Sequence, residues 1–159
     1  MNGSRYNIEF ISLTKLFRGR LSYPELVEVN YESPILLKKA LYQCAKYFQR
    51  EGYSDWCHYD MSEKDFIGFL FLDHNYAHAI GACIFRLREY ENIPKPFNTM
   101  HWVWLHPYAR NKGILSRYVD FFNKRFGYWY PETPHSKAMQ AFTEKHNMVS
   151  PIIYFKIDV

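Results

Sequence analysis

The order of hydrophobic and polar residues predicts strands and helices along most of the chain. YNIEFISL (residues 6–13) alternates apolar and polar side chains, which is typical of a half-buried strand. A polar, irregular stretch follows, and Ser33 and Pro34 then provide an N-cap and a first helical position. Apolar residues recur at helical spacing from there until Gly52, which predicts a helix. Its apolar positions are Ile35, Leu36, Ala40, Leu41, Cys44, Ala45 and Phe48.

The middle of the chain predicts an antiparallel hairpin. Residues 66–72 and 76–87 are rich in apolar and aromatic side chains, and the DHN sequence between them is a plausible turn. The following ENIPKPFN (91–98) contains two prolines. Because proline cannot donate a ladder hydrogen bond, we expect a loop there.

The second half of the chain predicts three more strands with two helices between them. We expect strands at 99–105, 128–130 and 152–159, and helices over 112–126 and 136–146. This order, combined with the hairpin, predicts an α/β (α+β) fold with a mixed central sheet and helices on both faces. The sequence has no internal repeat and no low-complexity segment.

Composition limits the class of protein without identifying it. A chain of 159 residues with 48% hydrophobic content predicts one globular domain with a real core. The aromatic content of 19% favours dense ring packing and a cleft lined by rings with polar tips. The net charge of +4 mildly favours acidic partners such as phosphates, nucleic acid or an acidic protein surface.

The cysteine count and the hydropathy pattern indicate a cytoplasmic protein. Three cysteines without CxxC spacing form neither a disulfide framework nor a cysteine-rich zinc site. MNGSRYNIEF has no apolar signal core, and about 18 consecutive apolar residues occur nowhere, so we expect neither export nor a membrane span. The pairs His74/His78 and Cys57/His58 lack further ligands, and we expect no metal.

The strongest chemical signal is HPYARNKGILSRYV (106–119), which joins an apolar strand to the start of a helix. A helix N-terminus carries unpaired amides and partial positive charge, so it favours phosphate oxygens. Gly113 lets a ligand approach the backbone, and Arg110 and Lys112 add positive charge. Pro107 ends the sheet ladder and leaves strand groups free for an extended partner.

Coenzyme A matches both halves of this junction. Its pantetheine arm carries amides that can pair with the strand edge near Leu105, while its pyrophosphate can bind the amides of residues 111–115. We therefore predict a site for coenzyme A. The predicted cofactor-binding residues at the junction are Val103, Trp104, Leu105, Arg110, Asn111, Lys112, Gly113, Ile114, Leu115 and Ser116.

The run LHPYARNKGIL resembles the acetyl-CoA signature of the GCN5-related N-acetyltransferases (GNAT superfamily), an apolar strand, a proline, then R/Q-x-x-G-x-G/A opening a helix. Arg110 and Gly113 match this pattern, whereas Leu115 stands where the family usually has Gly or Ala. The resemblance implies one acetyltransferase-like domain over 1–159, with residues 66–159 as the acetyl-CoA-binding core and 1–60 as a variable acceptor-side region.

The last predicted helix extends this resemblance and departs from it at one position. SKAMQAFTEKHNM is similar to the family's NxxAxxLYEKxGF, with Ser136 at the Asn position, Phe142 at the Leu position and Glu144 and Lys145 as the EK pair. The resemblance implies that the cofactor is acetyl-CoA and that Phe142 is a further cofactor-binding residue. Thr143 stands where the family has a Tyr that protonates the CoA thiolate. A threonine hydroxyl is a poor proton donor beside a phenol.

Residues 101–157 also resemble the C-terminal half of the cohesin acetyltransferases. The matching positions are Trp102, Val103, Arg110, Lys112, Ile114, Ser116, Arg117, Thr133, Pro134 and Phe142. The zinc-finger module of that branch is absent, so the likeness supports the fold and the cofactor and does not imply a cohesin substrate.

Acetyl transfer to an amine needs an oxyanion donor, a base for the ammonium and an acid for the thiolate. The amide of residue 105 or 106 is the candidate oxyanion donor. His101 and His106 are candidate bases beside the strand, with His135 and Tyr130 as alternatives. For the acid, Ser136 or a nearby Tyr ranks above Thr143.

We therefore predict an acetyl-CoA-dependent N-acetyltransferase that acts on a primary amine by direct attack in a ternary complex. The acceptor could be a protein, a small molecule or an aminoacyl-tRNA, and the protein a monomer or a homodimer. A weakly catalytic or non-catalytic acyl-CoA-binding regulator on the same fold is the alternative. A nucleic-acid module is a third reading, but no RNA-binding signature is present.

Overall fold

The computed structural model describes residues 21–23, 25–53, 59–73 and 78–157. They form a six-stranded mixed sheet whose strands lie side by side in chain order. The strands are β1 (Leu21–Tyr23), β2 (Leu26–Val29), β3 (Phe66–Leu72), β4 (Ala79–Arg88), β5 (Phe97–Leu105) and β6 (Trp129–Pro131). All neighbours are antiparallel except β5 and β6, which run parallel.

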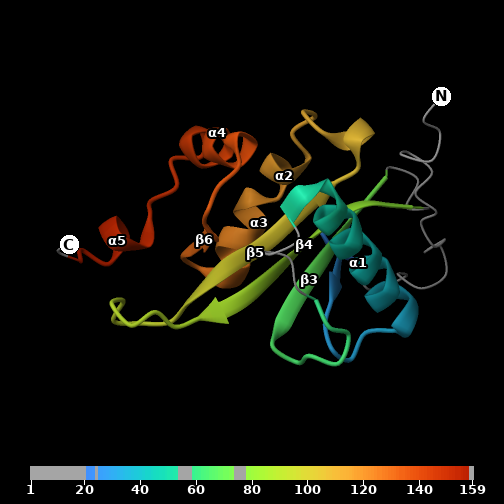
Figure 1. The fold of residues 1–159 in the computed structure, drawn as a ribbon, viewed down its shortest axis with the longest axis horizontal. Coiled ribbons are helices and arrows are strands. Elements are labelled where there is room, and N and C mark those ends of the chain that lie inside the picture. Colours follow the sequence, from blue (N-terminus) through green and yellow to red (C-terminus); the bar gives the residue numbers. More distant parts are fainter. Residues whose placement is uncertain (1–20, 24, 54–58, 74–77, 158–159) are drawn as a thin grey trace.

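Helices cover both faces of this sheet (Figure 1). On one face α1 (Ile35–Phe48) packs on the first buried cluster, which includes Leu70, Ile84 and Trp102. On the other face α2 (Ile114–Arg117) and α3 (Val119–Phe126) pack on a second cluster that is rich in phenylalanine. The predicted α/β fold, with a mixed sheet between helices, is confirmed.

The helix and the hairpin predicted in the first part of the chain are both confirmed. Along α1 the buried side chains include Leu37, Leu41, Cys44 and Ala45, a helical spacing that places them on one face against the sheet. A π-helical turn, Gln49–Tyr53, continues α1 up to the predicted stop. β3 and β4 form the predicted antiparallel pair, although β4 begins at residue 79.

The elements around the junction differ from the prediction in detail. Phe97 and Asn98 already belong to β5, because Phe97 is buried and Asn98 pairs with β6, so the loop ends earlier than expected. The single helix predicted over 112–126 is wrong. Tyr118 leaves helical geometry with φ −104° and ψ 4°, and it separates α2 from α3. The 3-10 turn Pro107–Ala109 (η3) precedes this pair of helices.

The end of the chain contains one confirmed element and one wrong prediction. Helix α4 (Lys137–Lys145) begins after Ser136 as predicted, and β6 lies one residue later than expected. The predicted strand over 152–159 is wrong, because Pro151–Tyr154 forms the short helix α5. A proline with helical φ at its first position favours that turn over strand geometry.

Two strands were not predicted, and one predicted strand cannot be compared. β1 and β2 lie in the stretch expected to be irregular, although Leu26, Val27 and Val29 are fully buried. These segments are short, so their periodicity is hard to distinguish from a loop. The predicted strand at 6–13 lies outside the described residues. In the part of the chain that the structure describes, no helix is long and apolar enough to cross a membrane.

Candidate active site

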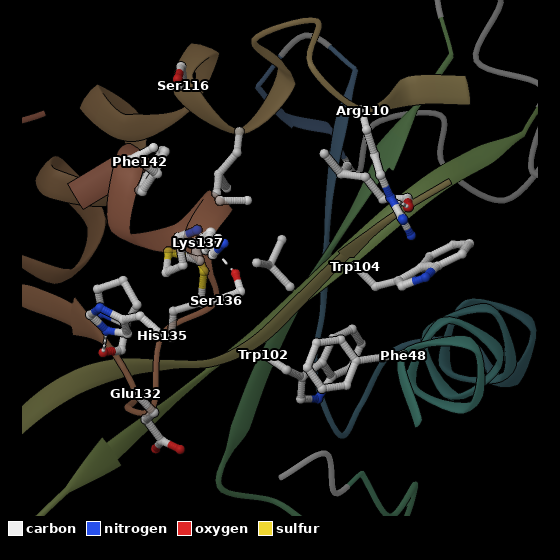
Figure 2. Close-up of a pocket in the computed structure, with 18 of the residues that line it drawn as sticks. Phe48, Trp102, Trp104, Arg110, Ser116, Glu132, His135, Ser136, Lys137 and Phe142 are labelled. Carbon is white, nitrogen blue, oxygen red and sulfur yellow. Dashed lines mark hydrogen bonds between the residues drawn. The ribbon is translucent and has the colours of Figure 1, made fainter. Parts of the chain in front are cut away.

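The candidate site lies where β5 continues past the end of its parallel neighbour. β6 pairs with β5 only as far as Met100 and Pro131, and the amide of Glu132 then donates to the carbonyl of Met100 at 2.9 Å. β5 runs on to Leu105 while the other segment turns away toward α4 (Figure 2). The edge of β5 from residue 101 onward therefore faces a cavity instead of a strand.

Backbone direction along β5 decides which groups face that cavity. The amide of His106 donates to the carbonyl of Ile80, on the β4 side, at 2.8 Å. Because backbone groups alternate along a strand, Val103 and Leu105 direct theirs to the open edge. The carbonyl of Leu105 accepts from Arg110 Nε at 2.8 Å, as this alternation requires. Of the two predicted oxyanion donors, only the Leu105 amide lies at the open edge.

The cavity has a volume of about 1150 Å³ and extends to both faces of the sheet. Its α4 half is lined by Leu115, Ser116 and Phe142, which lie on the second-cluster side of β5 (Figure 2). Its α1 half is lined by Phe48 and Trp102, on the opposite side. One continuous cavity thus joins both faces around the edge of β5.

A loop with two left-handed residues leads from η3 into α2. Asn111 has φ 60° and Gly113 has φ 72°, and Gly113 is the N-cap of α2. A Cβ on Gly113 would meet no atom within 4 Å, so the space beside its Cα is open. Residues 111 and 113–116, which belong to the predicted cofactor-binding set, line the cavity.

The two basic residues predicted at this loop have different positions. Arg110 lines the cavity, but two hydrogen bonds hold its guanidinium in place. Nε donates to the carbonyl of Leu105, and Nη2 donates to Glu51 Oε1 at 2.5 Å. Lys112 is exposed and does not line the cavity. Arg110 therefore fixes the end of β5, and the positive charge that faces the cavity on the α4 side comes from other residues.

That charge comes from α4. Lys137 and Lys145 line the cavity together with Ala141, at i, i+4 and i+8 on one face of the helix. The cavity-lining carboxylates among the described residues are Glu51 and Glu132, and both are ion-paired with arginines. The α4 half is therefore basic. Neither lysine is among the predicted cofactor-binding residues, although their helical spacing was a usable signal.

Of the four predicted catalytic side chains, His101 and Ser136 line the cavity. Ser136 Oγ accepts from the Met139 amide at 3.1 Å and so caps α4. His106 and Tyr130 do not line it. His106 Nδ1 accepts from the Tyr108 amide at 3.1 Å and caps η3, while Tyr130 belongs to β6.

Two further residues weighed as proton carriers also have defined contacts. His135 lines the cavity, and its Nε2 lies 2.9 Å from the carbonyl of Pro131. Thr143 is buried, and its hydroxyl donates to the carbonyl of Gln140 at 2.9 Å. Thr143 is directed into its own helix and does not line the cavity, which agrees with its low rank as an acid.

A partly buried carboxylate that no motif indicated lies at the start of the α1 half. Glu132 Oε1 accepts from Arg86 Nε, and Oε2 accepts from Arg86 Nη2, both at 2.7 Å. Thr99 Oγ1 donates to the same carboxylate at 2.7 Å, and His101 Nδ1 lies 2.7 Å from Oε2. Burial alone would raise the pKa of Glu132, but these hydrogen bonds outweigh it and lower the pKa to about 2.

Comparison with solved structures identifies the fold as that of known acetyltransferases. An aminoglycoside acetyltransferase from an uncultured soil metagenomic sample is 13% identical, with a TM-score of 0.52 over 84% of this chain and 97% of that one. A possible acetyltransferase from Clostridium difficile 630 is 12% identical, with a TM-score of 0.54 over 79% and 90%. Aminoglycoside N-acetyltransferase AAC(6')-Iy in complex with CoA is 15% identical, with a TM-score of 0.52 over 79% and 92%.

These likenesses confirm, at the level of the fold, the resemblance to the GCN5-related N-acetyltransferases. No protein-family model matches the sequence, and no curated protein matches it significantly.

Proposed function

We propose that this protein is an acetyl-CoA-dependent N-acetyltransferase that transfers the acetyl group to a primary amine by direct attack in a ternary complex. The observation that carries this proposal is the cavity around the open edge of β5. Its volume of about 1150 Å³ exceeds the ~300–1,000 Å³ usual for one small ligand, and it opens to both faces of the sheet. Such a cavity suits two substrates that meet at one strand edge.

The α4 half fits the cofactor. The outward backbone groups of Val103 and Leu105 can pair with the amides of a pantetheine arm, as a neighbouring strand would. Gly113 leaves open space where the phosphates would approach, and Lys137 and Lys145 supply positive charge. One structural neighbour was solved with CoA bound, which agrees with this assignment.

The α1 half fits the acceptor. Phe48, Trp102 and Trp104 form aromatic walls there. His101 Nε2 and Trp102 Nε1 are buried and have no hydrogen-bond partner in the part of the chain that the structure describes. Buried polar atoms without partners are rare, and a polar substrate that carries both hydrogen-bond donors and acceptors would satisfy them. Several structural neighbours are aminoglycoside acetyltransferases, so small-molecule amines belong in the first panel of acceptors.

The reaction needs few protein groups in this geometry. The amine nitrogen attacks the acetyl carbon and the Leu105 amide stabilises the oxyanion, while His101 takes the proton that the amine loses. The C–S bond then breaks, and the CoA thiolate takes a proton from Ser136 or from water. Thr143 does not serve as the acid, because its hydroxyl is bound to Gln140.

Calorimetry and steady-state kinetics test the proposal. We expect acetyl-CoA to bind the purified protein, and we expect turnover of at least one member of a panel of small amines, peptides and aminoacyl-tRNA. Double-reciprocal plots at several acceptor concentrations should intersect, as a ternary complex requires. Folded protein that does not bind acetyl-CoA would refute the proposal.

The acyl-CoA-binding regulator remains the second candidate, because Thr143 stands where the family has its acid. The same measurements distinguish the two functions. Tight acetyl-CoA binding without turnover of any acceptor in the panel would favour the regulator. Turnover that depends on His101 would favour the enzyme.

A further inference from the structure

His101 occupies an irregular position in the sheet. Ile84 of β4 pairs with Trp102 and the next residue, Phe85, pairs with Met100, so His101 is the extra residue of a β-bulge. Its side chain is only 6% exposed, and its ring lies 6.2 Å from that of Phe66, on the α1 side of the sheet. The bulge therefore places this imidazole on the α1 side of the sheet, where His101 lines the wall of the cavity.

Glu132 determines which imidazole nitrogen carries the proton. Its carboxylate is 13% exposed and accepts two hydrogen bonds from Arg86 and one from Thr99. A second arginine, Arg88, lies 3.8 Å away, so the carboxylate is an anion and can only accept. His101 Nδ1, at 2.7 Å from Oε2, must therefore be the donor.

We infer that Glu132 is a positioning residue that holds His101 as the Nδ1–H tautomer and leaves Nε2 as the proton acceptor for the attacking amine. The inference rests on the proposed function. The lone pair of Nε2 diverges from the Nδ1–H bond and so points away from Glu132. Nε2 is buried and has no partner among the described residues, so its lone pair is not engaged there.

The proton balance of the step follows from this arrangement. The amine nitrogen forms the new C–N bond, and its proton moves to Nε2, which gives an imidazolium. The positive charge forms beside the Glu132 carboxylate, which stays ionised because Arg86 and Thr99 still donate to it. The C–S bond of the thioester then breaks, and the leaving CoA thiolate takes a proton from Ser136 or from water. Glu132 thus stabilises the charge that His101 acquires without taking the proton itself.

Isotope-edited nitrogen NMR of the wild-type protein tests the tautomer without any turnover. At about pH 8.5 we expect His101 Nδ1 to show the shift of a protonated nitrogen and Nε2 that of an unprotonated one. His101→Gln assigns the two signals by their loss. The opposite tautomer in the wild type would overturn the inference even if the enzyme is active.

Kinetics of Glu132 variants test the consequence. Glu132→Gln keeps the shape but its amide can donate to Nδ1, so we expect kcat to fall on the order of 10²-fold while the Kd for acetyl-CoA is unchanged. Glu132→Asp keeps the charge and should recover part of the loss. Glu28→Gln removes the partner of Arg125, 3.1 Å away in an exposed pair, and is the matched control with unchanged kcat.

The two hypotheses fail in different ways. Wild-type kcat in folded Glu132→Gln, checked by its NMR spectrum, would overturn the role of Glu132 and leave the acetyltransferase in place. No acetyl-CoA binding by the wild-type protein would overturn the proposed function itself. Recovery of His101→Ala activity by added imidazole would support His101 as the base that Glu132 positions.

Discussion

At the scale of single residues, Glu132 shows how a partly buried charge depends on its surroundings. Its side chain is 13% exposed, and hydrogen-bond donors on β4 and β5 stabilise the carboxylate. Removing one partner of a buried ion pair typically costs ~3–5 kcal/mol, because the other partner is left uncompensated. The ion pair with Arg86 therefore contributes to folding as well as to the chemistry proposed above.

The first prediction concerns the pH dependence of this contribution. The pKa of Glu132 is lowered from 4.5 to about 2 in the folded protein, so its stabilisation is present above about 4.5 and is lost as the pH falls toward 2. Glu132→Gln should cost roughly 3 kcal/mol of unfolding free energy near neutral pH, and the difference from wild type should shrink in acid. Urea unfolding at several pH values measures it. A difference that does not vary with pH would contradict this account.

The second prediction concerns Gly113. The open space beside its Cα is where we place the cofactor phosphates, so Gly113→Glu should abolish acetyl-CoA binding measured by calorimetry. Gly127→Glu is the control, because Gly127 also has positive φ and open space but lies outside this cavity. Retained affinity in folded Gly113→Glu, with its thermal midpoint checked, would place the phosphates elsewhere.

At the scale of elements, two glycines in neighbouring strands differ in whether a side chain could replace their hydrogen. A Cβ on Gly81 would collide with backbone of β5, at the Trp104 carbonyl and at Leu105 Cα. A Cβ on Gly68 would instead meet a terminal methyl of Leu41 at 2.5 Å, and that flexible side chain can move. The separation of β4 and β5 therefore depends on Gly81.

The third prediction follows from this pair of glycines. Gly81→Ala must push apart two strands beside the cavity edge, so we expect a loss of ~2–3 kcal/mol in unfolding free energy and weaker acetyl-CoA binding. Gly68→Ala should cost less, about 1 kcal/mol, and should leave binding unchanged. Denaturant unfolding and calorimetry on both variants measure the difference. Equal effects of the two substitutions on binding would contradict it.

The sequence predicted the elements in which the regular spacing of apolar residues continues over many positions and ends at turn-forming residues. Helix α1 and the β3–β4 hairpin are of this kind. The break at Tyr118 was not predictable, because its side chain is buried at a position that also suits one continuous helix. Helix α5 was missed because residues 152–154 (IIY) have high strand propensity. The preceding proline and the local backbone hydrogen bonds instead stabilise a helical turn.

The candidate site was predictable to a similar extent. The junction motif lies on consecutive residues, so the sequence indicated that the loop around Gly113 would reach a ligand, and this loop does line the cavity. Glu132 contacts Arg86 and Thr99, which are 46 and 33 residues away, and no local pattern records such contacts. Polar networks between residues so distant in the sequence can be recognised only once the fold is known.

At the scale of the whole molecule, the end of β6 and the length of β5 together create the site. β6 stops pairing at Pro131, and β5 extends beyond it to Leu105, so one strand presents backbone groups to the cavity while its bulge places His101 on the α1 side. Helices on both sides complete the two halves. The fold thus separates the region proposed for the cofactor from the region proposed for the acceptor.

The fourth prediction tests this separation with one variant in each half. Phe48→Leu removes an aromatic wall of the α1 half, so it should raise KM for the best acceptor of the panel about 10-fold without changing the Kd for acetyl-CoA. Leu115→Ala shortens a side chain of the α4 half and should raise the Kd for acetyl-CoA by a similar factor, with the acceptor KM unchanged. Steady-state kinetics with saturating partner substrate and calorimetry supply both constants. If the two effects were exchanged, the acceptor would bind on the α4 side, and His101 would lie on the wrong face of the sheet to act as its base.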